Sequence, residues 1–295
     1  MQKKLLLIVN PKAGKRRSRA WFFDVMAVFS QAGYLTCLRQ TAGPGDAQRI
    51  AREEGAAYDL VVCCGGDGTL NQTVNGILEL DAPPPVGYIA CGSTNDFAAS
   101  IHLPSEPAAA AGQIAASGGR RLDVGLFNDR HFMYVASFGA FTKVSYSAPQ
   151  STKNELGHLA YIIEGMKDLS TLRLYPARIE ADGEVFEGRF LFGAIANTTS
   201  LGGVVKIRHD AVDMSDGLFE LILVPEPKSP AVLNDMIRAV LLQEYSGSQG
   251  IIFRHVSHVV VESPEALDWS LDGEGAMGYH RAEITALHRK LHMQV

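Results

Sequence analysis

The stretch Gly65-Gly66-Asp67-Gly68-Thr69 constrains the fold of this chain more than any other feature. Residues 58–64 before it are apolar and rich in β-branched side chains, which predicts a strand buried on both faces. After it, Leu70, Val74 and Ile77 recur at helical spacing. The glycines therefore lie in a turn that joins a buried strand to a helix, the repeating unit of an α/β sheet.

The same turn has the properties of an anion-binding site. Glycine allows backbone angles that a side chain forbids, and it lets another group approach the main chain closely. Free N–H groups at the start of the following helix suit an anionic oxygen, and a phosphate is the natural ligand. Asp67 would repel that phosphate unless a cation such as Mg2+ lies between them. The alternative is a tight turn without a ligand, which needs fewer glycines and no carboxylate.

Two familiar phosphate-binding loops are excluded by inspection. No Gly-Lys-Ser or Gly-Lys-Thr marks a P-loop. Asn71 occupies the sixth position of a Gly-x-Gly-x-x-Gly count from Gly66, which breaks the dinucleotide-binding pattern. The turn therefore predicts a phosphate site of another class.

The length of the chain predicts either two domains or one domain with a large extension. The 295 residues exceed one typical domain, and 46% hydrophobic residues suit a large buried core. No apolar run is long enough to span a bilayer or to serve as a signal peptide, and the four cysteines have no metal-ligand spacing. We therefore expect a cytoplasmic protein with reduced cysteines. A net charge of -5 argues against a nucleic acid partner, although the basic run at 12–19 could either face solvent or attract phosphates or an anionic membrane.

The N-terminal part alternates short strands with helices. Strands are expected at residues 4–9, 34–40, 58–64 and 86–91. This alternation predicts a doubly wound parallel sheet with helices on both faces. Parallel strands end at a common edge, so the loops that follow them should converge there. Those loops are residues 10–14, 41–46, 65–69 and 92–96.

From about Leu122 onward the pattern changes to antiparallel β structure. Asn128-Asp129 and Asp182-Gly183 are predicted hairpin turns. Further strands are expected at residues 218–224, 253–262, 266–271 and 282–291. Two helices interrupt them, one with apolar residues between 156 and 166 and one that opens at Ser229-Pro230. These helices could enclose an acyl chain, or they could simply cover a core.

Two further acidic groups could carry chemistry. Asp272 and Glu274, separated by one glycine at the end of a strand, could supply a proton acceptor and its neighbour, and a solvated turn is the alternative. Asp213 and Asp216 could hold Mg2+ or Ca2+. Their residues alone favour an ordinary Asp-Gly turn before a strand.

Five motifs occur in order and cover nearly the whole chain: Asn10-Pro11-x-x-Gly14, Gly65-Gly66-Asp67-Gly68-Thr69 with Leu70-Asn71, Gly92-Ser93-Thr94-Asn95-Asp96-Phe97-Ala98, Asp213-x-x-Asp216-Gly217-Leu218 and Leu271-Asp272-Gly273-Glu274. In these motifs the chain resembles the soluble bacterial lipid kinases of the diacylglycerol kinase catalytic-domain family, in the same superfamily as sphingosine and ceramide kinases. Ser93 is a departure, because many members have threonine there, but the hydroxyl is kept.

The resemblance implies an α/β nucleotide-binding domain, an antiparallel β-sandwich-like lipid domain and an ATP site in the cleft between them. The first domain would span residues 1–124, with 284–295 as a candidate return segment, and the second residues 125–283. Glu274, with Asp272 beside it, would take the proton from the lipid hydroxyl. The residues expected to contact ATP are Asn10, Thr41, Gly65, Gly66, Asp67, Gly68, Thr69, Leu70, Asn71, Ser93 and Asn95.

The resemblance also implies metal-binding residues. Asp67 would act through Mg2+, with Asp96 and Asp123 as a supporting acidic network. A structural Mg2+ loop would comprise Asp213, Asp216 and Leu218, the first and last through main-chain carbonyls.

The implied reaction is ATP- and Mg2+-dependent transfer of the γ-phosphoryl group to a lipid alcohol, with diacylglycerol as the default substrate and phosphatidic acid as the product. The implied partners are the lipid, the inner face of the membrane through peripheral contact, and a second copy in a homodimer. One alternative is an NAD kinase, which shares the Gly-Gly-Asp-Gly-Thr turn but not the Asn-Pro-x-x-Gly start or the distal Asp-Gly-Glu. The other is a catalytically silent lipid- or nucleotide-binding protein of the same fold.

Overall fold

The structure is a computed structural model that describes residues 2–13, 20–93, 95–139, 173–201 and 205–295. It divides into two compact units, Met1–Leu122 with Arg289–Val295 and Asp123–His288. No helix within those described ranges is long and apolar enough to cross a membrane. Most of the basic run at 12–19 and the helix expected between residues 156 and 166 lie outside the described residues.

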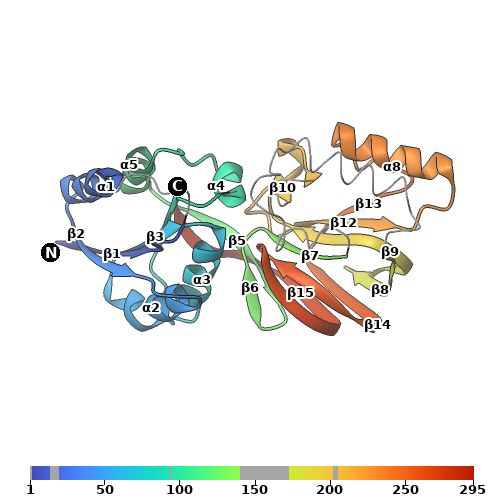
Figure 1. The fold of residues 1–295 in the computed structure, drawn as a ribbon, viewed down its shortest axis with the longest axis horizontal. Coiled ribbons are helices and arrows are strands. Elements are labelled where there is room, and N and C mark those ends of the chain that lie inside the picture. Colours follow the sequence, from blue (N-terminus) through green and yellow to red (C-terminus); the bar gives the residue numbers. More distant parts are fainter. Residues whose placement is uncertain (1, 14–19, 94, 140–172, 202–204) are drawn as a thin grey trace. The chain divides into compact units, whose positions relative to one another are not determined.

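The first unit contains a parallel sheet with the strand order β4-β3-β1-β2 (Figure 1). Its strands are β1 (Lys3–Val9), β2 (Tyr34–Gln40), β3 (Leu60–Gly65) and β4 (Val86–Ala90). Its helical elements are α1 (Ala20–Gln31), α2 (Asp46–Glu54), η1 (Gly55–Ala57), α3 (Asp67–Leu78), α4 (Asp96–Ser100) and α5 (Pro107–Ala116). The four strands predicted from the pattern are confirmed in position and in direction.

Helices cover both faces of this sheet, as Figure 1 shows. On one face, Phe29 of α1 and Ile114 of α5 are buried in a cluster with Val62 of β3. On the other, α2 and α3 pack so closely that a Cβ on Gly76 would lie 2.2 Å from the carbonyl oxygen of Gln48. Because both faces are covered, β1, β3 and β4 contain nearly continuous buried apolar runs, whereas the edge strand β2 is more polar and more exposed.

The last strand of the chain returns to the first unit. β15 (Glu274–Gln294) is 21 residues long, and its residues Met293 and Gln294 pair in parallel with Val86 and Gly87 of β4. Arg289, where the returning segment begins, has a left-handed backbone with a φ of 49°. The apolar pattern predicts only residues 282–291 as strand, because two glycines interrupt the pattern in its first half.

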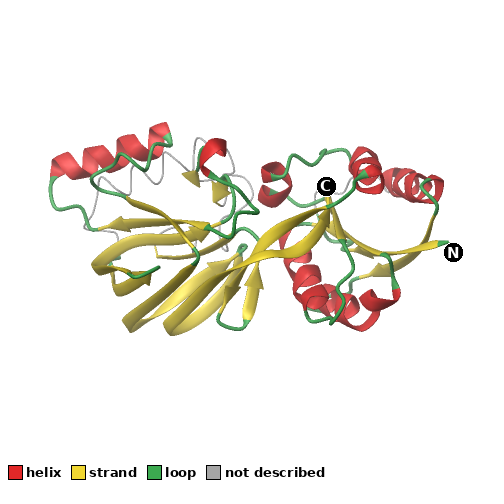
Figure 2. Cartoon of the chain, turned by 180° about the vertical axis from the view of Figure 1, so that it is seen from behind, coloured by secondary structure: helices red, strands yellow, loops and turns green. Residues whose placement is uncertain are grey.

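The second unit consists mainly of antiparallel strands (Figure 2). They are β5 (Arg120–Phe127, which starts in the first unit), β6 (Arg130–Phe132), β7 (Val135–Gly139), β8 (Tyr175–Ala181), β9 (Glu184–Ala196), β10 (Ser200–Leu201), β11 (Val205–Lys206), β12 (Phe219–Pro225), β13 (Ile252–Val256), β14 (His258–Leu271) and the first part of β15. Its described helical elements are η4 (His209–Ala211) and α8 (Pro230–Leu242). The predicted start of α8 is confirmed, because the Val232 N–H donates to the Oγ of Ser229 at 3.3 Å.

Both predicted hairpin turns are confirmed. Asn128, with a φ of 51°, lies between β5 and β6. Asp182 and Gly183, with φ values of 46° and 89°, lie between β8 and β9. Asp272 and Gly273 form a third turn of this kind, with φ values of 50° and 84°, between β14 and β15. Two successive positive φ angles match the twist of paired strands, which favours Asp-Gly at these positions.

The expectation of one strand over residues 253–262 is wrong. One strand ends before Ser257 and another begins after it. The N–H and the Oγ of Ser257 donate to the carboxylate of Asp182 at 2.7 and 3.0 Å. β13 therefore pairs with β12, whereas β14 pairs with β8. The break expected between residues 262 and 266 does not occur, because the strand continues through Pro264 where the β14–β15 register shifts. At such an irregularity the strands are not fully paired, so the missing N–H of Pro264 costs the sheet no hydrogen bond.

Aromatic rings fill the core of the second unit. The Trp269 ring of β14 lies 5.0 Å from the Phe127 ring and 4.9 Å from the Phe138 ring, measured between centroids. All three side chains are buried, together with the inward residues of β8, β9 and β12. This packing joins β14 to β5 and β7.

Candidate functional site

The loops after the four parallel strands lie along one edge of the first unit's sheet. The N–H of Asn10 donates to the carbonyl of Cys64 at 2.9 Å, and the N–H of Cys91 donates to the carbonyl of Gly65 at 2.7 Å. Thr41 follows β2 and donates its N–H to β1 in the same manner. The hydrogen-bond ladder thus continues past the strand ends, which brings the four predicted loops together.

The glycine turn is a site of close packing. β3 ends at Gly65, and Gly66 precedes α3 with an extended backbone (φ -94°, ψ -178°). A Cβ on Gly65 would lie 2.6 Å from the Cβ of Thr69, and a Cβ on Gly92 would lie 2.6 Å from the Cα of Gly66. The additional backbone angles that glycine allows are not used here, because no glycine of this turn has a positive φ. The group that approaches this main chain closely in the structure is the loop after β4, and the approach of a phosphate stays a prediction.

The start of α3 has the features of an anion site. No side chain in the described part of the chain caps this helix end. The side chain of Asn10 donates from Nδ2 to the Oγ1 of Thr69 at 3.0 Å, which fixes both residues. Among the described residues no side chain accepts from the first-turn N–H groups of Asp67 and Gly68, so these groups suit an outside acceptor.

Asp67 connects α3 to α4. Its Oδ2 accepts the N–H of Asp96 at 3.2 Å, and its Oδ1 lies 3.4 Å from the hydroxyl of Tyr88. Burial raises the pKa of Asp67, while the N–H groups of Asp96 and Phe97 act in the opposite direction. The carboxylate therefore has a structural role in addition to the predicted role toward Mg2+. Tyr88, a strand residue, is a contact that no motif indicates.

Asn95 contributes an unsatisfied acceptor to the same edge. It has a left-handed backbone (φ 55°), and its Nδ2 donates to the carbonyl of Gly92 at 3.1 Å. Its Oδ1 is buried and has no hydrogen-bond partner among the described residues. A buried acceptor without a partner is costly, so this atom suits a donor from a ligand. Of the other predicted contacts, Thr41 and Asn71 are buried and Ser93 is exposed.

In the second unit, Asp272 is fixed by backbone groups. Its side chain is buried, and its carboxylate accepts the N–H groups of Met133, Tyr134 and Val135 at 2.6, 2.9 and 3.0 Å. These bonds hold the β14–β15 turn against the start of β7. We infer that Asp272 positions the turn rather than carries a proton.

Glu274 differs from Asp272 in exposure. Its side chain is 36% exposed, and its Oε2 lies 3.9 Å from Nη2 of Arg130. Arg130 also donates to the carbonyl of Gly275 at 3.4 Å. The hairpin thus presents Glu274 at its surface, with a guanidinium beside it. Arg130 belongs to none of the sequence motifs, so its position beside this turn becomes known only from the structure.

The segment from Asp213 to Leu218 is a tight turn, as its residues alone predict. Asp213 accepts the N–H of Ser215 at 3.0 Å, and Asp216 accepts the N–H of Leu218 at 2.9 Å. Asp123 supports the turn, because its buried side chain accepts the N–H of Gly217 at 2.6 Å. The role of these residues in binding Mg2+ stays a prediction, as does the ATP site in a cleft between two domains.

A metal site built from side chains alone is not present in the described ranges, where no group of three or more His, Cys, Asp or Glu residues could hold an ion. Mg2+ is usually bound by one or two carboxylates together with phosphate oxygens and water. The carboxylate of Asp67 beside the uncapped start of α3 fits that mode.

Glu220 of β12 is a buried carboxylate that the sequence does not indicate. It stands between apolar residues of a strand, where the alternation of side chains would predict a charged residue to face solvent. Its side chain is 2% exposed, and its Oε2 has no partner among the described residues. Its Oε1 lies 3.8 Å from Nε2 of His255. Burial, assisted by Asp216 and Asp213, raises the pKa of Glu220 to about 9. The group is therefore protonated at neutral pH.

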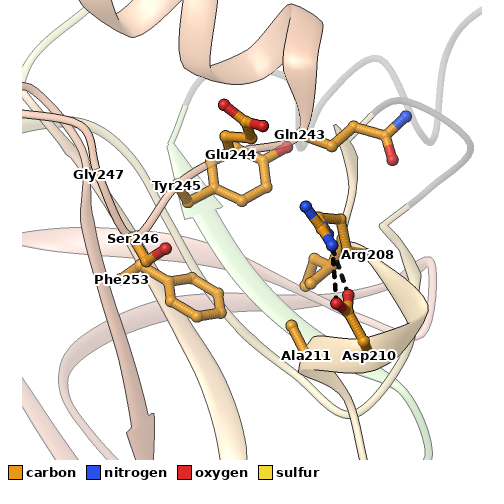
Figure 3. A pocket seen from close by; sticks show the side chains of 10 residues that line it. Arg208, Asp210, Ala211, Gln243, Glu244, Tyr245, Ser246, Gly247 and Phe253 are labelled. Atoms are coloured by element: carbon orange, nitrogen blue, oxygen red, sulfur yellow. Dashed lines mark hydrogen bonds and ion pairs between the residues drawn. The ribbon is translucent and has the colours of Figure 1, made fainter.

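A separate pocket in the second unit has a volume of about 400 Å³ (Figure 3). It lies between η4 and the segment that follows α8, with Phe253 and Tyr245 as aromatic walls. Arg208 and Asp210 form an ion pair on its lining. None of the predicted site residues lines it.

Two family models match the chain. The model described as diacylglycerol kinase catalytic domain matches residues 4–127. The model described as YegS C-terminal NAD kinase beta sandwich-like domain matches residues 135–291. The first match covers the parallel sheet, and the second covers the antiparallel strands.

Curated relatives match over nearly the full length. A diacylglycerol kinase of Bacillus subtilis (strain 168) is 34% identical over 296 residues, which cover 99% of this chain and 96% of the relative. A diacylglycerol kinase of Staphylococcus aureus (strain bovine RF122 / ET3-1) is 34% identical over 275 residues, which cover 93% of this chain and 87% of the relative.

Solved structures share the fold. A diacylglycerol kinase from Bacillus anthracis str. Sterne matches with a TM-score of 0.76 and 24% identity, over 99% of this chain and 96% of that one. Another crystal structure from the same organism matches with a TM-score of 0.83 and 25% identity, at the same coverage.

Proposed function

This chain belongs to the diacylglycerol kinase catalytic-domain family and is a lipid kinase, and we propose that it transfers the γ-phosphoryl group of ATP to the hydroxyl of diacylglycerol, giving phosphatidic acid. The two curated relatives described above are diacylglycerol kinases, which favours this reaction over the NAD kinase alternative. The NAD kinase wording in the second family model refers to the sandwich-like domain.

The observation that carries the proposal is the uncapped start of α3 in contact with the loop after β4. The N–H groups of Asp67 and Gly68 would bind phosphate oxygens, because a helix N-terminus favours negative charge. The buried Oδ1 of Asn95, which has no partner within the described ranges, would accept a hydrogen bond from the nucleotide. Gly66 and Gly92 allow the two loops to pack directly against each other, since any side chain there would meet the opposite loop.

Mg2+ would be held by Asp67, with Asp96 next to it, together with phosphate oxygens. When bound, the ion neutralises charge on the transferring phosphoryl group. Asp67 meanwhile keeps the two loops joined through the Asp96 N–H. The structural Mg2+ loop from Asp213 to Leu218 is a further part of the proposal.

Glu274 is the residue that we assign as general base. Its carboxylate would accept the proton of the lipid hydroxyl as that oxygen attacks the γ-phosphorus. Arg130 limits the positions of this carboxylate, and Asp272 holds the turn that carries it. The assignment requires a cleft in which this turn faces the glycine turn.

The substrate is a membrane lipid, so we propose that the enzyme works in the cytoplasm at the inner face of the membrane through peripheral contact. A homodimer is part of the same proposal. Co-sedimentation with lipid vesicles tests the first statement, and analytical ultracentrifugation tests the second.

A single assay tests the proposed reaction. Purified protein is incubated with radiolabelled ATP, Mg2+ and either diacylglycerol, phosphatidylglycerol or ceramide in mixed micelles, or with NAD, and the products are separated by chromatography. We expect label in phosphatidic acid, and none without Mg2+. Label in another lipid alone would change the substrate, whereas label in NAD alone or in no product would contradict the proposal.

A further inference from the structure

Two thiols meet at the edge of the sheet that carries the proposed nucleotide site. The Sγ atoms of Cys64 and Cys91 lie 3.3 Å apart. Cys64 is the residue before Gly65 in β3, and Cys91 is the residue before Gly92 after β4. We propose that Cys64 and Cys91 are an oxidisable dithiol, which a hydroperoxide converts to a disulfide that crosslinks the two loops. Its effect on ATP rests on the proposed function, but its formation does not.

The geometry selects this pair from the four cysteines of the chain. Cys64 is in register with Ile89, so Cys91, two residues further along, projects from the same face. A disulfide needs a sulfur separation of about 2.05 Å, so the sulfurs must approach by roughly 1.2 Å. Cys63 alternates to the opposite face, and Cys37 lies on β2 at the other side of β1.

The exposure of the two thiols sets the order of the chemistry. Cys91 is partly exposed, whereas Cys64 is 2% exposed. The peroxide oxygen is therefore transferred to Cys91, which becomes a sulfenic acid as the O–O bond breaks and water leaves. The sulfur of Cys64 then attacks the sulfenic sulfur, loses its proton and releases a second water. In balance, two thiols and one hydrogen peroxide give one disulfide and two waters.

The environment of Cys64 makes the second step slow. Its hydrogen bond with Cys91, followed by burial, raises the pKa of the Cys64 thiol well above its ordinary value. A protonated thiol is a weak nucleophile, so the disulfide forms under sustained oxidation rather than at the basal peroxide level. Disulfides in cytoplasmic proteins are typically transient and form in response to oxidation, as this one would.

The crosslink would act directly on the glycine turn. A Cβ on Gly92 would already lie 2.6 Å from the Cα of Gly66 and 2.7 Å from the Oδ1 of Asn95, so these backbones have no free space between them. Drawing Cys91 toward Cys64 must therefore shift Gly92 relative to Gly66. That shift changes the positions of the N–H groups and of Asn95 at the phosphate site, and ATP affinity falls.

Peptide mapping tests the crosslink on the full chain. Trypsin cannot separate the two thiols, because no Lys or Arg lies between Arg52 and Arg120. Cleavage after Glu79 by a glutamyl endopeptidase does separate them. We expect a linked pair of peptides after treatment with hydrogen peroxide, and its loss after dithiothreitol. The link should persist in the controls Cys63→Ala and Cys37→Ala and be absent in Cys64→Ala, Cys91→Ser and Cys91→Ala.

ATP affinity is measured on the same samples with a fluorescent ATP analogue. We expect at least a fivefold weaker affinity in the oxidised wild type, restored by dithiothreitol and not seen in peroxide-treated Cys91→Ser. Over-oxidation of Cys91 without a linked peptide would overturn the proposal, as would a linked protein of unchanged affinity. If the reduced protein binds no ATP, the proposed function fails, and the peptide map alone decides whether the dithiol exists.

Discussion

The backbone N–H of Asp96 donates to Oδ2 of Asp67 at 3.2 Å, across 29 residues of sequence. This bond joins the first turn of α3 to the first turn of α4. One carboxylate therefore holds together two loops that are both expected to contact ATP. Its charge and its structural role need separate tests.

Replacing Asp67 separates those roles. We expect Asp67→Ala to lower the free energy of unfolding by about 1–3 kcal/mol, because buried amide donors lose their acceptor. Asp67→Asn keeps an acceptor oxygen, so it should retain most of the stability yet still weaken the response to Mg2+. Urea denaturation measures the first effect, and Mg2+ titration of kinase activity measures the second. An unchanged Mg2+ dependence in Asp67→Asn would contradict the role toward the cation.

Replacing Glu274 tests the general base. We expect Glu274→Gln to lower kcat at least about a hundredfold while ATP binding persists, because the amide keeps the shape but cannot accept the proton. The matched control is Glu265→Gln, an exposed glutamate of the same unit that pairs with Arg173. Steady-state kinetics with diacylglycerol and equilibrium binding of ATP give the two quantities. Near-normal turnover in Glu274→Gln would remove this residue from the mechanism.

Replacing Gly92 tests the close approach of the two loops. We expect Gly92→Ala to destabilise the protein by about 1–3 kcal/mol and to weaken ATP binding, since the new methyl group would lie 2.6 Å from the Cα of Gly66. The control is Gly112→Ala in α5, where a Cβ meets no atom within 4 Å. In a helix this change is expected to stabilise by up to about 1 kcal/mol. Equal thermal unfolding curves for the two variants would refute the packing argument.

Glu220 predicts a pH dependence of stability. Its pKa is about 9 in the folded protein and 4.5 without burial, so the unfolded chain loses this proton first as the pH rises. The stability that Glu220 provides is complete below about pH 4.5, falls as the pH rises between 4.5 and 9, and is lost above about 9. Glu220→Gln is a neutral mimic of the protonated acid and should abolish this fall.

Urea denaturation at pH 5, 7 and 9 checks that prediction. The wild type should lose a few kcal/mol more than Glu220→Gln over this range, by the usual conversion of a pKa shift to free energy. Parallel pH profiles for the two proteins would show that Glu220 is not buried as a protonated acid.

Local patterns predict much of the fold, because alternating strands and helices, Asp-Gly turns and the Ser229 cap depend on neighbouring residues. The break at Ser257 could not be predicted, since the carboxylate that causes it belongs to Asp182, 75 residues away. The β14 strand also continues through Pro264, where a pattern indicates a break. That continuation depends on a register shift with β15.

The candidate site was predictable in its residue types and less so in their roles. The glycine motif indicates a turn. No local pattern shows that this turn packs against the backbone of the loop after β4. The sequence does not show which of Asp272 and Glu274 is fixed and which is accessible. Only the fold shows that Asp272 is held by backbone N–H groups more than 130 residues away. The burial of Glu220 likewise depends on strands far along the chain.

The return of β15 has a consequence for how the protein is made. The Oγ of Ser117 bonds to the carbonyl of Val295, 178 residues later, and β4 pairs with Met293. During translation, the parallel sheet therefore emerges from the ribosome with one pairing edge still open, and it is completed only after the entire second unit has been synthesised. An open edge is a template for aggregation. Nascent chains stalled before residue 289 should accordingly depend on chaperones more than the finished protein does.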